Sequence, residues 1–103
     1  IQVISLQPDF ALHGLEGWKH LETAKIPLIY DDTVADSNST IDTADAYKFI
    51  KEAYNKEGLF LSPSSAANLA GAIRLANEIT EGVIVTILPD NGDKYSEVIK
   101  QIL

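Results

Sequence analysis

The stretch E-G-L-F-L-S-P-S-S-A-A-N-L-A-G at residues 57–71 constrains the fold more than any other part of this chain. Gly58 can end a helix in the left-handed conformation that other residues resist. The apolar residues 59–61 predict a short, fully buried strand. Pro63 then turns the chain, because proline fixes its own φ and keeps the residue before it out of the helical region. The stretch therefore predicts a helix end, a strand, a tight turn and a second helix.

Two hydroxyl groups follow the proline at the predicted start of the second helix. Ser64 or Ser65 can cap this helix by accepting a hydrogen bond from an amide two or three residues further on. Behind them come small residues that allow close approach to the helix backbone, namely Ala66, Ala67, Ala70 and Gly71. One interpretation is a capped helix that packs tightly on a sheet. The other is a ligand site, because helix N-termini favour negative charge and open α/β sheets bind ligands beyond the carboxyl ends of their strands.

Strand and helix signals alternate along the rest of the chain, which predicts an α/β fold: a parallel-type sheet with flanking helices, in three layers. The expected strands are 1–6, the weak and peripheral 39–41, and 83–88, which is apolar on both faces as in a central parallel strand. Residues 10–36 show no sustained period, and such a long irregular connection is usually a functional loop or disordered.

Three helices are expected between and after these strands. The first starts at Asp42 or Thr43 and has an apolar face at helical spacing made of Ala46, Phe49, Ile50, Ala53 and Tyr54. The second runs from about residue 65 to 80 and should bury Leu69, Ile73 and Ala76. A short third helix begins near Tyr95. The turns at 62–65 and 89–93 should lie at one edge of the sheet, since parallel strands carry their carboxyl ends together.

Composition excludes several classes of function. The chain has 103 residues, so we treat 1–103 as one domain. Eight basic against 15 acidic residues give a net charge of −7, which argues against nucleic-acid binding. The absence of cysteine excludes disulfides and thiolate sites. No run is long enough for a membrane helix and no secretory signal opens the chain, so we expect a cytoplasmic protein without a membrane partner.

Other candidate sites are weaker. His13 and His20 lie near acidic residues in the irregular segment, but their spacing does not favour a metal site, and we expect none. Asp31 with Asp32, or Asp90 with Asp93, could form a carboxylate pair, although solvated turn residues are the better interpretation. Neither a P-loop nor a G-x-G-x-x-G motif is present.

Several blocks of the sequence match one known pattern. The block 57–67 is similar to E-G-(L/I)-x-x-G-x-S-S-G-A-A, and P-D-N-G-D-K-Y at 89–95 is similar to P-D-x-G-D-R-Y. L-E-G-W-K-H-L-E at 15–22 and I-P-L-I-Y-D at 26–31 are similar to I-E-G-L-K-H-M-E and P-x-I-Y-D. In this order and spacing, they resemble the C-terminal region of pyridoxal-phosphate-dependent cysteine synthases, and more narrowly the B-type O-acetylserine sulfhydrylases.

The resemblance implies an incomplete fold, the C-terminal portion of the large domain of a fold type II pyridoxal-phosphate enzyme. It also implies site residues. Ser64 matches the family serine that hydrogen-bonds the pyridine nitrogen of pyridoxal 5'-phosphate, in place of the anion otherwise expected there. Pro89 matches the segment beside the cofactor ring, and Asp90 and Gly17 match residues that border the substrate pocket. Ala66 departs from the family glycine and adds a methyl group near the ring.

The lysine that holds the cofactor in this family, and its phosphate-binding loop, match no segment of the chain. The chain also contains no methionine and begins at Ile1. We therefore expect part of a longer, homodimeric cysteine synthase that uses O-acetylserine or O-phosphoserine and needs its missing N-terminal half. These residues alone should contain no catalytic residue and be inert. The alternative is a free-standing, non-catalytic small-ligand or interaction domain.

Overall fold

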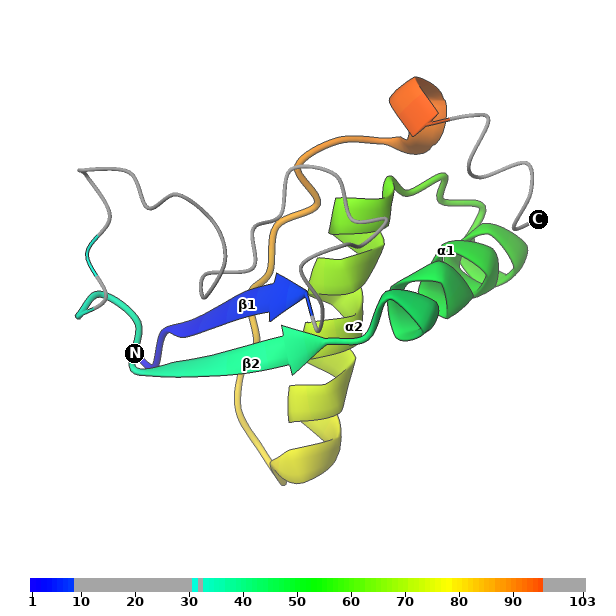
Figure 1. Cartoon of the computed structure of the whole chain (residues 1–103). Coiled ribbons are helices and arrows are strands. Elements are labelled where there is room, and N and C mark those ends of the chain that lie inside the picture. Colours follow the sequence, from blue (N-terminus) through cyan, green and yellow to red (C-terminus); the bar gives the residue numbers. More distant parts are fainter. Residues whose placement is uncertain (9–30, 32, 96–103) are drawn as a thin grey trace.

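The computed structural model describes residues 1–8, 31 and 33–95, with the backbone alone at 94 and 95. Its elements are the strands β1 (Ile4–Pro8) and β2 (Ser37–Ile41), the helices α1 (Thr43–Glu57) and α2 (Pro63–Glu78), and the 3-10 turn η1 (Gly92–Tyr95). Figure 1 shows β1 and β2 side by side, with α2 crossing one face of this sheet and α1 continuing from the end of β2. The predicted α/β class, a parallel sheet with flanking helices, is confirmed.

The two strands pair in parallel, with Ile4 opposite Ser37 and Pro8 opposite Ile41. The first strand was expected to end at residue 6, but it continues through Gln7 and the buried Pro8. The second strand likewise starts two residues before the expected 39–41. Both differences have one reason: the ladder joins backbone groups, so polar residues can extend a strand beyond its apolar part.

Helix α1 forms where its sequence predicts it. Asp42 caps its start by accepting a hydrogen bond from the Ala44 amide at 2.9 Å. Gly58 ends it with φ of 68°, the left-handed conformation expected at this position. Its buried side chains are those of Ala46, Ile50 and Ala53. Tyr54, expected on the buried face, is 49% exposed because it lies at the edge of that face near the helix end.

Helix α2 starts earlier than expected and buries a different face. Its cap is Ser62, so the prediction that Ser64 or Ser65 caps it is wrong. Pro63 takes the first helical position, where the missing amide costs no hydrogen bond. The fully or nearly fully buried residues are Ala66, Ala67 and Ala70, not the predicted Leu69, Ile73 and Ala76, which are half-buried or exposed.

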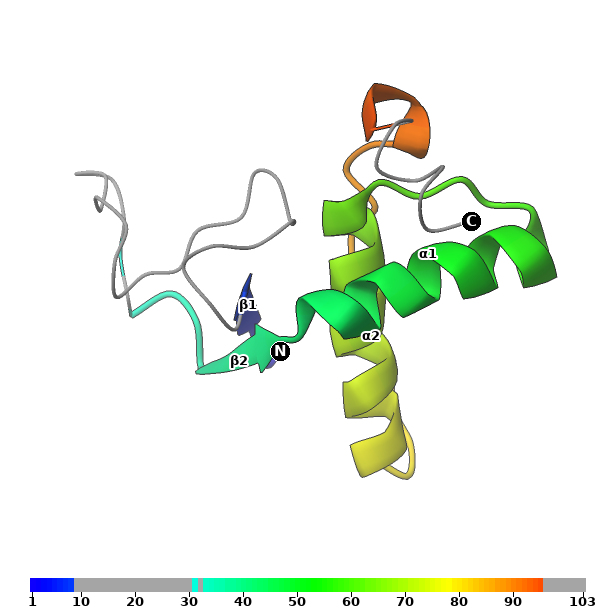
Figure 2. The same cartoon turned by 45° about the vertical axis from the view of Figure 1, so that its right-hand side comes forward.

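The small residues of α2 explain this difference. Figure 2 shows α1 crossing α2, and the alanines of both helices form the contact together with Ile50 and Leu61. Further along α2, an added Cβ at Gly71 would lie 2.7 Å from Leu6 Cδ1 on β1. Small side chains therefore allow α2 to lie close to α1 and to the sheet. Its larger side chains, such as Leu69 and Ile73, lie beside these contacts and are only half-buried.

The predicted central strand at 83–88 is wrong for this structure. The segment is extended, but no described residue pairs with it as a strand. Val83, Val85 and Ile87 are 91%, 86% and 70% exposed. A strand needs a neighbouring strand for its backbone groups, and β1 and β2 lie elsewhere. The segment instead runs back along α2 towards η1 (Figure 1).

The predicted strand at 59–61 is also wrong. Leu59 is 48% exposed, and Leu61 alone is buried, where it forms one antiparallel bridge with Asn91. The three residues bridge two helices and are too few to form a ladder there. The third helix was expected to begin near Tyr95, where η1 ends, and it lies outside the described residues.

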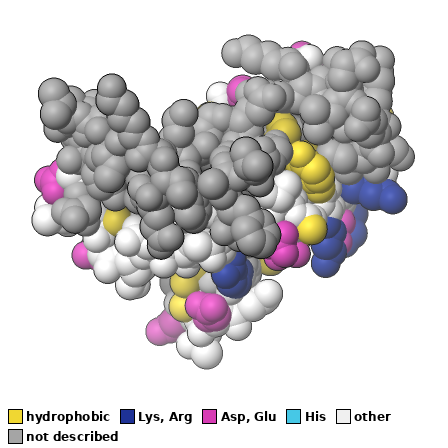
Figure 3. All heavy atoms as spheres, in the orientation of Figure 1, with side chains coloured by type: hydrophobic (Ala, Val, Ile, Leu, Met, Phe, Trp, Pro, Cys, Tyr) yellow, Lys and Arg dark blue, Asp and Glu magenta, His cyan; other side chains and the backbone are white. Residues whose placement is uncertain are grey.

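On the face in Figure 3, the acidic and basic side chains that can be seen are interspersed. Within the described part of the chain, no helix is both long and apolar enough to cross a membrane.

Candidate functional site

The turn that begins α2 is the most deeply buried segment of the described chain. Every residue from 61 to 67 is buried. Ser62 and Ser65 are completely inaccessible to solvent, and Ser64 is 9% exposed. Buried hydroxyl groups cost free energy unless they are hydrogen-bonded, so their partners indicate what the turn is built to do.

The three hydroxyl groups have different partners. Ser62 Oγ accepts a hydrogen bond from the Ser65 amide at 3.2 Å and lies 2.9 Å from Ser65 Oγ. Ser65 Oγ donates to the backbone carbonyl of Asp90 at 2.8 Å. Among the described residues, Ser64 Oγ has only a contact of 3.4 Å with Ser62 Oγ, which is long for a hydroxyl pair. Ser64 is thus the one whose hydroxyl is left with the weakest bond.

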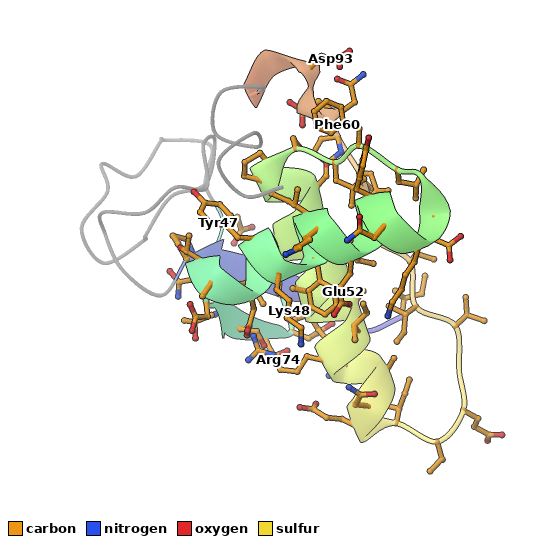
Figure 4. The ribbon with its side chains drawn as sticks, turned by 90° about the vertical axis from the view of Figure 1, so that its right-hand side faces the viewer. Tyr47, Lys48, Glu52, Phe60, Arg74 and Asp93 are labelled. Carbon is orange, nitrogen blue, oxygen red and sulfur yellow. The ribbon has the colours of Figure 1, made fainter. Side chains whose placement is uncertain are left out.

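The turn at 89–93 lies directly against this helix start, so the two turns lie together as predicted, although no described strand leads into either of them. Besides the bond from Ser65 to Asp90, the Gly92 amide donates to the Phe60 carbonyl at 2.8 Å. Figure 4 shows Phe60 and Asp93 together at this end of the molecule. A third tie lies further back, where Asn68 Nδ2 donates to the Ile87 carbonyl at 2.8 Å. Two segments about 25 residues apart in sequence thus form one site.

The predicted site residues differ in their surroundings. Pro89 is exposed, and Asp90 is half-buried beside the helix start. Asp90 Oδ1 is itself buried and has no hydrogen-bond partner among the described residues. Gly17, the other predicted pocket residue, lies outside the described residues, as do His13 and His20. The described residues hold no group of acidic or histidine side chains suited to a metal ion.

Two hollows lie on the described surface. One, of about 370 Å³, adjoins the site and is lined by residues 58–61 together with Leu88, Asp90, Asn91 and Asp93. The other, of about 550 Å³, lies between α1 and α2 and contains none of the predicted site residues. Figure 4 shows Lys48 and Arg74 on its side of the two helices. Of these two hollows, the one lined by Asp90 is the better candidate for a ligand site, because it adjoins the buried turn.

Sequence reasoning missed the role of Ser62. A signal was present, because a serine directly before a proline combines a preferred cap residue with the residue preferred at the first helical position. The small residues after it suggested a close approach by a ligand. In the structure they are buried against α1 instead.

Comparison with known proteins adds the family. Residues 4–90 match the family described as pyridoxal-phosphate dependent enzyme. The chain belongs to this family. The α/β part described here is accordingly a portion of a fold type II domain, as the resemblance implied.

Individual relatives agree with this assignment. The chain is 43% identical over 99 residues to the cysteine synthase of Aquifex aeolicus, covering 92% of this chain and 30% of that protein. It is 31% identical over 97 residues to cysteine synthase B of Escherichia coli, with coverage of 92% and 31%. The crystal structure of cysteine synthase from Entamoeba histolytica superposes with a TM-score of 0.83 at 26% identity, covering 93% of this chain and 31% of that one. The chain thus spans roughly 30% of these relatives.

The buried turn fits one end of pyridoxal phosphate. A pyridine nitrogen accepts a hydrogen bond, and the Ser64 hydroxyl is a nearly buried donor without a strong partner. The phosphate end needs positive charge or free amides, but residues 61–67 contain no lysine or arginine and the Ser65 amide is already bound to Ser62. The residues present therefore suit the ring nitrogen and leave the phosphate to another part of the protein.

Proposed function

We propose that this chain is the C-terminal part of a B-type cysteine synthase. The complete protein would make L-cysteine from O-acetylserine or O-phosphoserine and a sulfur donor. The family match and the identity to two cysteine synthases support this proposal. The observation that carries it is the Ser64 hydroxyl, which is buried but held only by a contact of 3.4 Å.

The proposed roles are those that the resemblance to the family implies. Ser64 donates a hydrogen bond to the pyridine nitrogen, and Pro89 lies beside the ring. Asp90 and Gly17 border the substrate pocket. Pyridoxal phosphate, when bound, withdraws electrons from the substrate so that the leaving group can depart from the β-carbon. The missing N-terminal half would supply the lysine and the phosphate site, and the whole protein would act as a homodimer.

A serine suits this role better than a carboxylate. A hydroxyl donates to an unprotonated nitrogen, whereas an ionised aspartate favours a protonated one. Aspartate has an ordinary pKa of about 4, so it would normally be charged at this position. We therefore expect Ser64→Asp to lower cysteine formation strongly. Ser64→Ala should lower it less, because it removes one hydrogen bond without reversing the preferred state of the nitrogen.

The test uses the full-length protein and measures cysteine formation from O-acetylserine or O-phosphoserine with sulfide. The wild type should retain pyridoxal phosphate and be active, and the two variants should lose activity in the order given. Unchanged turnover and an unchanged cofactor absorption spectrum in both variants would reduce Ser64 to a packing residue. A full-length protein that binds no cofactor would favour the non-catalytic ligand or interaction domain.

A further inference from the structure

Besides Ser64, the site contains a second polar side chain whose bonding is incomplete, that of Asp90. Its Oδ1 is buried and has no hydrogen-bond partner in the described part of the chain. A desolvated acceptor of this kind costs about 1–3 kcal/mol and more when charged. Nearly all such atoms in native proteins have a partner, so an exception needs a cause.

Three donors beside Asp90, the Ser65 hydroxyl and the amides of Gly92 and Asp93, have other acceptors among the described residues. Ser65 gives its only hydroxyl proton to the Asp90 backbone carbonyl, which cannot donate in return. The contact of 2.9 Å between Ser62 and Ser65 must then use the proton of Ser62. The Gly92 amide donates to Phe60, and the Asp93 amide donates to Asn91 Oδ1 at 3.0 Å. Within the described residues, the site thus fixes the backbone of Asp90 and leaves its Oδ1 without a partner.

We propose that Asp90 is a specificity residue whose carboxylate accepts a hydrogen bond from an N–H or O–H group of the substrate, and that Ser65 is the positioning residue that holds it there. Asp90 is one of the residues that line the hollow beside the helix start, the space in which such a group would lie. The buried Ser65 hydroxyl anchors the backbone of this residue at 2.8 Å. The inference rests on the proposed function, and it goes further by assigning a hydrogen bond to the substrate to the carboxylate of Asp90.

The chain offers a matched control for Ser65. Asn68 also donates from α2 to a carbonyl of the same segment, at the same distance of 2.8 Å. Its bond is exposed and ends at Ile87, three residues before Asp90. Removing either donor loosens the segment, but only the loss of Ser65 releases Asp90 itself.

The experiment uses the full-length protein loaded with pyridoxal phosphate and compares Asp90→Asn, Ser65→Ala and Asn68→Ala. Binding of L-serine, which lacks the acetyl leaving group, is followed by cofactor fluorescence, and kcat and KM are measured with O-acetylserine. Amide exchange at Gly92 reports on the segment without any substrate. We expect Asp90→Asn to weaken serine binding roughly tenfold, the usual cost of one hydrogen bond to a charged group.

Ser65→Ala should raise the dissociation constant and KM in the same direction as Asp90→Asn, by a smaller factor, with little change in kcat and faster exchange at Gly92. Ser65→Cys keeps a weak donor of similar size and should lie between wild type and Ser65→Ala. If Ser65→Ala does not fold, Ser65→Cys takes its place in the comparison. Asn68→Ala should leave serine binding unchanged.

Wild-type serine affinity in Asp90→Asn would overturn the role of Asp90. Equal effects of Ser65→Ala and Asn68→Ala on binding would overturn the positioning role of Ser65, since both would then act only through the stability of the segment. Loss of cofactor binding or cysteine formation in the wild type is a different result. It would overturn the proposed function and this inference with it.

Discussion

Two stretches of this chain, the turn that begins α2 and the segment expected as a central strand, differ completely in their burial. Residues 61–67 are buried throughout, whereas Val83, Val85 and Ile87 are at least 70% exposed. The first stretch has its partners within the described residues, in α1 and the segment after α2. The second has no neighbouring strand there. An apolar pattern therefore predicts that a segment will be covered, but not what covers it.

If the proposed function is right, other parts of the complete protein would cover residues 83–88. The relatives are about three times as long as this chain, which spans roughly 30% of them. In a complete enzyme, further strands would pair with residues 83–88. The difference between the two stretches then becomes a measurable difference between the 103-residue chain and the full-length protein.

The largest expected effect compares one isoleucine from each region. Ile50 is fully buried, and Ile87 is 70% exposed. In the 103-residue chain, Ile50→Ala should lower the free energy of unfolding by about 2–5 kcal/mol, as for other core truncations. Ile87→Ala should change it by less than about 0.5 kcal/mol. Denaturant titration checks both values. In the full-length protein the cost of Ile87→Ala should approach that of Ile50→Ala, and equal costs in the short chain would contradict the comparison.

The second prediction concerns self-association of the short chain. An extended, unpaired and uncharged apolar segment is a template for pairing with another strand. Sedimentation velocity should therefore show dimers or larger species, and Val85→Lys should shift them towards monomer. The control is Asp93→Lys, which changes an exposed residue outside the segment and raises the net charge by two units where Val85→Lys raises it by one. A compact monomer with cooperative unfolding in the unmodified chain would show that the segment needs no cover.

A smaller effect is expected where the chain enters the buried stretch. Gly58 has φ of 68°, and an added Cβ would meet no atom within 4 Å. Gly58→Ala should therefore cost about 1–2 kcal/mol through backbone conformation alone. Thermal unfolding measures this cost. A neutral result would mean that the link between α1 and α2 relaxes, which would make the buried region softer than its packing indicates.

The smallest effect lies outside both regions. Thr33 donates to Asp31 Oδ1 from its hydroxyl at 2.6 Å and its amide at 2.9 Å, and these bonds lower the pKa of Asp31 below its ordinary value. Because the folded-state pKa is depressed, the small stabilisation is present above the unfolded pKa of about 3.9 and is lost as the pH falls through the folded pKa. Thr33→Val removes the hydroxyl bond and should raise the pKa of Asp31, which an NMR titration measures. An unchanged value would assign the shift to the amide alone.

The sequence predicted what depends on local chemistry. Asp42 and Gly58 cap α1 as expected, since each cap is complete within a few residues. The two turns were predicted to lie together at one sheet edge, and they do lie together, but the reason was wrong, because neither 59–61 nor 83–88 is a strand here. The fate of residues 83–88 could not be predicted, because it depends on strands that the described residues do not include. The prediction of the buried face of α2 was wrong because it assumed that the larger leucine and isoleucine side chains would be buried. The close contact between the helices buries alanines instead.

The ties from α2 to the segment after it have a thermodynamic consequence. Ser65 and Asn68 join the helix start to Asp90 and Ile87. A cofactor bound at the turn would stabilise these ties, and so would a strand paired along 83–88. Each of the two binding events therefore favours the other by linkage. Completing the sheet should raise cofactor affinity, and cofactor should raise the affinity between the two parts of the protein by the same factor.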